Sequence, residues 1–238
     1  MGASFDILTK PWVPVLDAAG QKTELGLLET LERAHELQAI QTASPMEEYS
    51  VYRFLIVFLM DALRPEDGEE DIGGLLEAEQ FDMEAIQDYL TQCRKEGVSF
   101  DLFDAERPFL QTTYVEAWDR EAKPVSTLDY TIPNGNNHIH FDHRRNEISY
   151  TPGKALRMLL TAQNFCTAGA QGYPSNVNGA PPWFALIQGK TLFQTLVLGM
   201  IGTDEILLPF DEPTVLWRNK KEITAKQEVA KTSWLYGM

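Results

Sequence analysis

Cysteine is scarce in this chain, and its scarcity argues against two classes of protein. The 238 residues contain two cysteines, Cys93 and Cys166, which lie far apart and form no CxxC pair. This arrangement argues against a small scaffold held by disulfides and against a zinc site built on cysteine. We expect both side chains to behave as small buried hydrophobic groups in a reducing compartment.

Long hydrophobic runs and targeting segments are also missing. The longest apolar run, Phe54–Met60, is far shorter than the roughly 20 residues that span a bilayer. The first residues have neither the basic start nor the apolar core of a signal peptide. We therefore expect a cytoplasmic protein that makes no contact with a membrane.

The negative charge of the chain is confined to its first half. Residues 1–128 contain 10 Lys and Arg against 26 Asp and Glu, a net charge of −16, whereas residues 129–238 contain 10 against 9. The whole-chain charge of −15 argues against contact with phosphate backbones, but the neutral second half leaves room for local basic patches. A solvated acidic face without a partner explains the asymmetry equally well.

The periodicity of apolar residues predicts an α+β fold. We expect one helix-rich globular domain with small, mostly antiparallel sheets and long functional loops. Helices are predicted at about 28–40, 44–63, 82–96, 151–165 and 191–200. The second of these is expected to be the central buried helix, with Ser44 as its cap and Glu47 completing a capping box.

Strands are predicted at residues 5–8, 12–16 and 23–25 around a turn, with Pro11 and Pro14 keeping this hairpin at a sheet edge. Further strands are expected at 184–188 and 206–208. Residues 66–71 carry five acids in six positions and predict an exposed loop. That loop lacks the ligand spacing of an EF-hand, which argues against a calcium site.

The segment Pro133–Asn146 concentrates imidazoles, amides and guanidinium groups. His138, His140 and Asp142 alternate along an extended strand, which suits Zn²⁺ or Mn²⁺ and makes a metal-dependent hydrolase one interpretation. A structural loop is a second interpretation. A recognition loop is the third, and we favour it because Asn and Gly dominate the approach to the histidines and two arginines follow them. The loop residues are Asn134, Gly135, Asn136, Asn137, His138, Phe141, Asp142, His143, Arg144 and Arg145.

A second loop, Thr167–Pro182, is rich in small residues that let a backbone approach a partner closely. It lacks the Gly-Lys-Ser/Thr of a Walker A motif and follows a helix, so it matches neither a P-loop nor a dinucleotide fingerprint. The alternative to a functional loop is an ordinary long loop that follows the end of a helix. The residues of interest are Ala168, Gly169, Ala170, Gln171 and Gly172.

Taken together and in order, five segments resemble the large subunit of the type I-E CRISPR Cascade complex, the CasA family. The segments are Phe5–Val15, Phe103–Gln111, Asn134–Asn137 leading into Phe141–His143, the small-residue loop after its helix, and Gly189–Leu196.

The resemblance implies a subunit without a catalytic centre, a bound metal or another cofactor. It implies that the subunit reads the flanking motif (PAM) of double-stranded target DNA and provides the dock for a helicase-nuclease effector. The loop around Asn134–His143 would then contact the guide CRISPR RNA at its 5′ end and the neighbouring Cascade subunit. The loop Ala168–Gly172 would approach the DNA minor groove, whose narrowness favours small side chains.

This sequence departs from the family pattern at two places. Ala168, Ala170 and Gln171 stand where a run of glycines is common, which predicts readout by a side chain or an altered motif preference. Family members also continue through a C-terminal helical bundle. We therefore expect residues 1–238 to correspond to the N-terminal domain, without that bundle.

Overall fold

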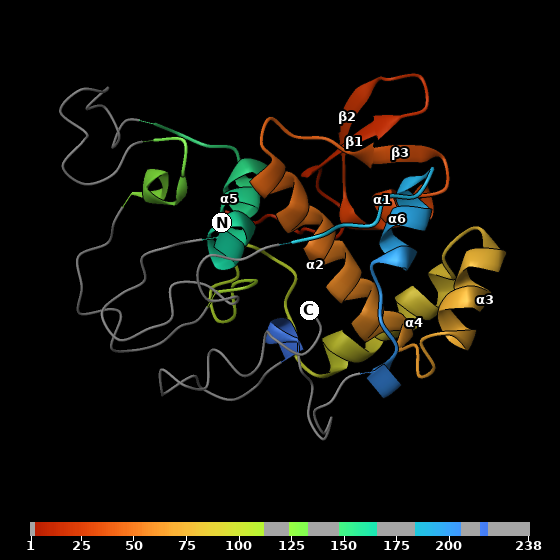
Figure 1. The fold of residues 1–238 in the computed structure, drawn as a ribbon. Coiled ribbons are helices and arrows are strands. Elements are labelled where there is room, and N and C mark those ends of the chain that lie inside the picture. The colour runs from red at the N-terminus through yellow and green to blue at the C-terminus, as the bar shows by residue number, and fades with distance from the viewer. Residues whose placement is uncertain (1–2, 112–123, 133–147, 166–183, 206–214, 219–238) are drawn as a thin grey trace.

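A computed structural model of the chain describes residues 3–111, 124–132, 148–165, 184–205 and 215–218. Within these ranges the chain combines a small sheet with helices packed around one long central helix (Figure 1). In chain order the elements are β1 (Val13–Asp17), β2 (Lys22–Leu25), α1 (Leu27–Glu32), β3 (Leu37–Ile40), α2 (Pro45–Leu63), α3 (Glu70–Ala78), α4 (Met83–Lys95), η2 (Val125–Leu128), α5 (Pro152–Phe165), α6 (Leu192–Leu198), η5 (Thr203–Glu205) and η6 (Leu216–Arg218). This architecture confirms the predicted α+β class.

The three strands form one antiparallel sheet in the order β2-β1-β3. The predicted turn between β1 and β2 is confirmed, because the Asp17 carboxylate accepts the backbone amides of Ala19 and Gln21. Gly20 supplies the positive φ of 79° that this turn requires.

The predicted edge position of the hairpin is correct for β2 but wrong for β1, which contains Pro14 and is the central strand. The Pro14 carbonyl accepts the amide of Gln41, one residue beyond the end of β3. The missing amide hydrogen of Pro14 therefore affects only the end of that ladder. Residues 5–8 form no strand either, since they contribute only the isolated bridge between Asp6 and Asp101.

The helix predicted at 28–40 is divided in the structure. α1 ends at Glu32, and Leu37–Ile40 pairs with β1 as the strand β3. The backbone amide of Ile40 donates a hydrogen bond of 2.9 Å to the hydroxyl of Tyr52, and Leu37 and Ile40 are both buried. Tertiary pairing thus overrides the helical spacing of the apolar residues in this segment.

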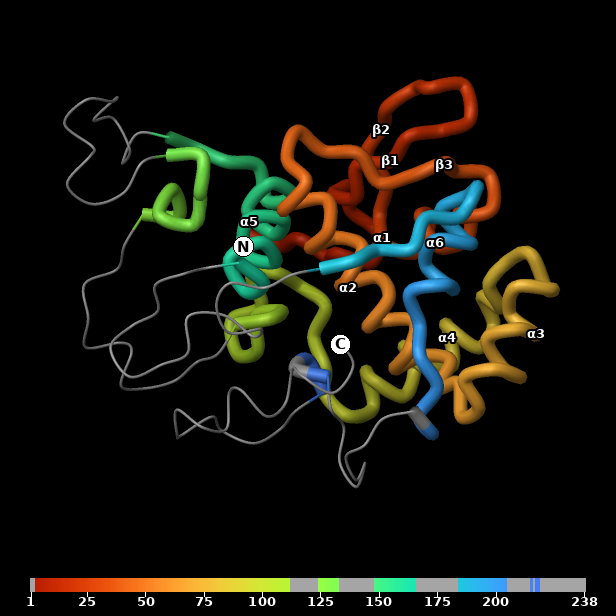
Figure 2. The backbone as a smooth tube through the Cα atoms, in the orientation of Figure 1, coloured from red at the N-terminus to blue at the C-terminus, as the bar shows by residue number. Residues whose placement is uncertain are grey.

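The central position of α2 is confirmed. Most of its side chains are buried, and α4, α5 and α6 all pack against it (Figure 2). The predicted capping box is wrong: the Ser44 side chain makes no hydrogen bond to the helix amides, and the Glu47 carboxylate binds cations on α5 instead.

Prediction succeeded for the helices α4, α5 and α6 and failed for two neighbouring segments. Asp82 caps α4 through the amides of Glu84 and Ala85, and Thr191 caps α6 through the amide of Gln194. The acidic residues Glu70 and Asp71 begin the unpredicted helix α3, whose apolar side chains pack against the core next to α6. Residues 184–188 form no strand, and the strand predicted at 206–208 lies outside the described residues.

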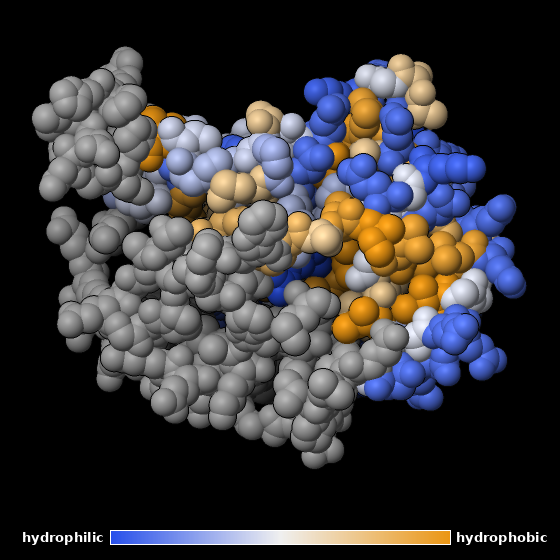
Figure 3. Space-filling view, viewed as in Figure 1, coloured by the Kyte–Doolittle hydropathy of each residue, from blue (hydrophilic) through white to orange (hydrophobic). Residues whose placement is uncertain are grey.

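On the face shown in Figure 3, hydrophobic side chains gather over α6 and the adjacent α3, with hydrophilic surface beyond them. Ile72, Leu75 and Leu76 of α3 are partly buried there. The contact between these two helices therefore extends the hydrophobic core toward the surface.

The short helix η6 closes the core from the opposite end of the sequence. The Trp217 ring lies 5.6 Å from Phe54, 6.4 Å from Phe58 and 6.0 Å from Phe109, measured between ring centroids. Its indole nitrogen donates to the Tyr89 hydroxyl at 2.8 Å, which in turn donates to Asp61 at 2.6 Å. The core is thus completed by a residue more than 120 positions downstream of Tyr89, to which it is hydrogen-bonded.

Candidate functional site

Both loops predicted to carry function lie outside the described residues. The first loop, with Asn134, Gly135, Asn136, Asn137, His138, His140, Phe141, Asp142, His143, Arg144 and Arg145, falls within 133–147. The second, with Ala168, Gly169, Ala170, Gln171 and Gly172, falls within 166–183. The structure does describe the residues from which each loop departs and to which it returns.

The two ends of the first loop are joined by Asp129. Its carboxylate accepts a hydrogen bond of 2.9 Å from the Tyr150 hydroxyl, across the loop, and further hydrogen bonds from the amide and hydroxyl of Thr131. Burial opposes ionisation of Asp129, but the hydrogen bonds from Thr131 and Tyr150, together with the charge of Lys154, lower its pKa below the ordinary value. Asp129 is therefore ionised at neutral pH and holds residues 129–131 against residue 150.

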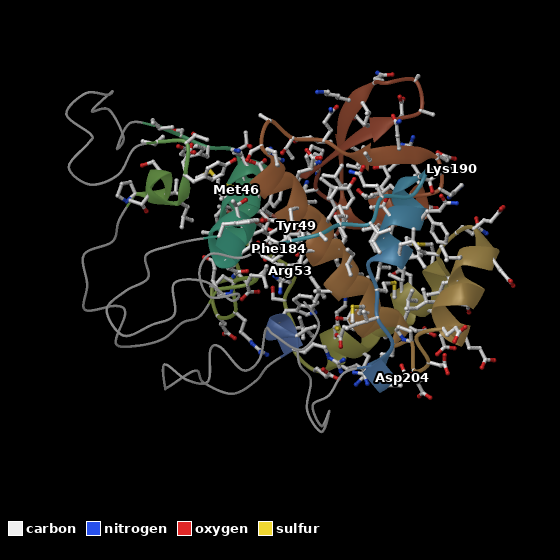
Figure 4. The ribbon with its side chains drawn as sticks, in the orientation of Figure 1. Met46, Tyr49, Arg53, Phe184, Lys190 and Asp204 are labelled. Carbon is white, nitrogen blue, oxygen red and sulfur yellow. The ribbon has the colours of Figure 1, made fainter. Side chains whose placement is uncertain are left out.

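The two ends of the second loop are joined by aromatic rings. Phe165 ends α5 and Phe184 is the first described residue after the loop, and their ring centroids lie 5.2 Å apart. Tyr49 of α2 stacks on Phe184 at 4.2 Å and meets Phe165 at 5.9 Å. We call Tyr49, Phe165 and Phe184 the aromatic clamp. The side chains of Tyr49 and Phe184 are labelled in Figure 4.

Arg53 lies beside the aromatic clamp, one turn after Tyr49 on α2 (Figure 4). Its guanidinium carbon is 5.8 Å from the centroid of the Phe184 ring, within the range of a cation–π contact. Burial lowers the pKa of Arg53, and the neighbouring Tyr49 partly offsets that effect. This residue adds a positive charge at the base of the second loop.

Helix α5 connects the two loops, and a buried ion-pair network fixes it to the rest of the fold. Arg157 donates from Nε to the Glu47 carboxylate at 2.7 Å, and from Nη1 to the Trp12 carbonyl at 2.7 Å and to Glu24 at 2.9 Å. Lys154 binds the second oxygen of Glu47. The loop bases therefore lie at opposite ends of a 14-residue helix, about 20 Å apart. This helix is held by Glu47 of α2, Glu24 of β2 and the Trp12 carbonyl.

Three of the segments that carry the family resemblance lie among the described residues, and two of them, Phe5–Val15 and Phe103–Gln111, form a framework next to α5. Residues 5–8 and 100–102 are joined by backbone hydrogen bonds, from Ile7 to the Phe100 carbonyl and from Leu102 to the Phe5 carbonyl. Asp104 accepts the amides of Arg107 and Glu106, and these hydrogen bonds lower its pKa below the ordinary value. Gln163 of α5 donates to the Leu110 carbonyl, which ties this framework to the helix.

Gly189 in the last of these segments is required by a close approach. A Cβ atom there would lie 2.3 Å from Cβ of Gln194, which real contacts do not allow. The Gln194 side chain in turn accepts the amide of Lys190, so the turn leading into α6 is closed by hydrogen bonds. Gly189 and Thr191 thus define how the chain enters α6.

Sequence reasoning selected the loops and missed their supports. Tyr49, Arg53, Asp129 and Glu47 were not singled out as parts of a site. A local signal is present in α2, where the charged residues Glu47, Arg53 and Asp61 stand among apolar ones, but Glu47 was interpreted as part of a capping box. Among the described residues there is no group of three or more metal-ligating side chains. No helix in the described part of the chain is long and apolar enough to cross a membrane.

Comparison with known proteins shows which family this chain belongs to. A family model described as CRISPR-associated protein Cse1 matches residues 6–236. The chain belongs to the Cse1 family. This assignment confirms the resemblance inferred from the ordered segments.

The proteins and solved structures that are similar to this chain match nearly all of it. The CRISPR-associated protein CasA/Cse1 of Thermus thermophilus is 32% identical, over 97% of this chain and 45% of the relative. The crystal structure of Thermobifida fusca Cse1 superposes with a TM-score of 0.74 at 25% identity, over 97% of this chain and 46% of the other. A chain of a structure titled "CRISPR RNA-guided surveillance complex, pre-nicking" shares the fold, with a TM-score of 0.70 at 22% identity over 92% and 46%. This chain therefore spans about half the length of these relatives.

Proposed function

We propose that this chain is a non-catalytic subunit of a type I-E CRISPR RNA-guided surveillance complex, the Cascade complex. In that role it reads the flanking motif of double-stranded target DNA, docks near the 5′ end of the guide RNA and supports recruitment of the helicase-nuclease. The observation that carries the proposal is the Cse1 family match over residues 6–236.

Physical arguments support the assignment of the two loops. The half of the chain that contains them is nearly neutral, so its electrostatics permit approach to phosphate backbones. Their bases are joined by short side-chain contacts and mounted on one helix whose buried charges are paired. A recognition loop needs such a rigid support, because its contacts lose affinity when the loop is held loosely. In RNA-guided complexes the protein reads the flanking motif and base pairing reads the rest.

The second loop is tested by substituting Gln171 in the complex assembled with guide RNA and the other subunits. We expect Gln171→Ala to change the order of affinities for duplexes that differ only in the flanking motif, by about 1–3 kcal/mol at the position that it contacts. Competition binding across a set of flanking sequences at one fixed salt concentration measures the effect.

The control is Gln80→Ala, which changes an exposed glutamine next to α3 and should leave the motif order unchanged. An unchanged motif order in Gln171→Ala would contradict the assignment of Ala168–Gly172 as the reader. Stoichiometric zinc or manganese that disappears in His140→Ala would instead favour a metal-dependent hydrolase built on His138, His140 and Asp142.

A further inference from the structure

The aromatic clamp is a separate cluster and not part of the main core. None of Tyr49, Phe165 and Phe184 belongs to the core cluster that contains Trp12, Phe54 and most of α2. The three rings nevertheless pack closely, with all centroid separations below 6 Å and edge-to-face or stacked geometry. Aromatic rings favour these arrangements, because the electron-poor edge of one ring meets the electron-rich face of another.

The clamp joins positions that are adjacent in space and separated by the whole second loop. Phe165 and Phe184 are the described residues on either side of 166–183, and Tyr49 contacts both from α2. Bringing the two ends of a loop together has an entropic cost, which the contacts at its base must offset. Rings that pack outside the core and at both ends of one loop therefore act chiefly on that loop.

Arg53 extends the same contact along α2. It follows Tyr49 by four residues, so the two side chains lie on one face of the helix, and its guanidinium group approaches the Phe184 ring. Arg53 is 8% exposed, which leaves little freedom for its side chain. Phe184 is thus held by two residues of a helix that is itself buried in the core.

We propose that Tyr49 is a positioning residue: through Phe165 and Phe184 it sets where the segment 166–183 leaves and rejoins the fold, and thereby sets the orientation of its motif-reading residues. This inference rests on the proposed function of Ala168–Gly172. It assigns to α2, far from the loop in sequence, a part in discriminating between flanking motifs, while Tyr49 itself makes no contact with DNA.

The test compares Tyr49→Ala with the conservative variant Tyr49→Phe, which keeps the ring. In the complete chain, hydrogen exchange should become faster within 166–183 in Tyr49→Ala and stay at the wild-type rate in Tyr49→Phe. In the assembled complex, the ratio of affinities for duplexes with the preferred and a disfavoured flanking motif should fall roughly tenfold in Tyr49→Ala and be retained in Tyr49→Phe. Phe184→Leu provides a second variant that removes a ring of the clamp.

A matched control separates positioning from general stability. Phe81 forms an aromatic pair with Phe193 at 4.7 Å within the main core, so Phe81→Leu should lower the melting temperature without changing motif discrimination. If Phe81→Leu reduces discrimination as much as Tyr49→Ala does, the inference is overturned. It is also overturned if exchange within 166–183 is unchanged in both Tyr49→Ala and Phe184→Leu.

The remaining outcomes distinguish this inference from the proposed function. The positioning role is overturned if Tyr49→Ala speeds hydrogen exchange within 166–183 but leaves motif discrimination unchanged, while Gln171→Ala does alter motif preference. If Gln171→Ala also leaves motif preference unchanged, the same Tyr49→Ala result overturns the proposed role of Ala168–Gly172 as the reader. Faster exchange together with reduced discrimination, rescued by Tyr49→Phe, supports both.

Discussion

Glu47 shows how a single charged residue connects the central helix to the support of both loops. Its side chain is 5% exposed and receives hydrogen bonds from Arg157 and Lys154 of α5. An isolated buried carboxylate would be strongly unfavourable, and so would a buried guanidinium group without its acceptor. The pairing therefore makes each charge tolerable only in the presence of the other, and it fixes α5 in one position on α2.

At this scale we predict that Glu47→Ala lowers the free energy of unfolding by about 3–5 kcal/mol, because it leaves the buried Arg157 without its main partner. Most of the loss comes from Arg157, since Lys154 is about one-third exposed and is stabilised by water when unpaired. Urea denaturation followed by circular dichroism measures the change.

The control for this prediction is Glu77→Ala, an exposed residue of α3, which should change stability by less than about 0.5 kcal/mol. Equal stability losses in the two variants would show that the buried ion pair does not stabilise the fold.

Among the elements, the three-residue helix η6 makes several buried contacts with the helices of the core. Arg218 donates to Glu96, the residue that follows α4, at 2.9 Å and to Asp61 of α2 at 3.4 Å. Burial opposes the charge of Arg218, but Glu96 and Asp61 raise its pKa above the ordinary value, so it stays charged. Burial and the adjacent Asp61 also raise the pKa of Tyr89, which therefore remains a hydrogen-bond donor. Together with Trp217, these contacts anchor η6 to two helices.

We therefore predict that Trp217→Ala lowers the free energy of unfolding by about 3–5 kcal/mol, since it empties a site lined by Phe54, Phe58 and Phe109. The melting temperature and the urea midpoint should both fall. Phe103→Ala serves as the control, because Phe103 is 44% exposed and should have a much smaller effect. If the two variants are equally stable, η6 does not complete the core.

The whole molecule divides into an acidic half that builds most of the core and a neutral half that carries the loops. The described helices α2, α4 and α6 and the sheet surround the buried aromatic residues, while α5 carries a loop base at each end. Two loop bases at opposite ends of one helix suit the proposed subunit, which would meet two partners at once. This arrangement supports the proposal that the first loop serves assembly and the second serves recognition of DNA.

At the molecular scale we predict that Asn136→Ala and Asn137→Ala weaken incorporation of this chain into the complex with guide RNA. The amide groups of these residues offer donors and acceptors to RNA or to a neighbouring subunit, and alanine removes them. Copurification with tagged partner subunits at a series of protein concentrations measures the loss.

For this prediction the control is Gln171→Ala, which should leave assembly intact while altering motif preference. Normal incorporation of both asparagine variants would contradict the role of the first loop.

The sequence alone determined those elements whose local signals agree. Apolar spacing and N-terminal caps agree for α4 and α6, and apolar spacing with a proline in the first turn locates α2 and α5. The family resemblance followed from the order of short segments. The helices depend on residues within a few positions of one another, where backbone preference and side-chain periodicity act directly.

Only the tertiary structure decided the contacts between distant segments. Leu37–Ile40 became a strand because β1 was available as its partner, and Glu47 became a partner of Arg157, 110 positions away, instead of a cap. Phe165 and Phe184 meet on Tyr49 only after α2 and α5 have packed together. Local sequence patterns do not predict such pairings, because burial and charge compensation are properties of the assembled fold.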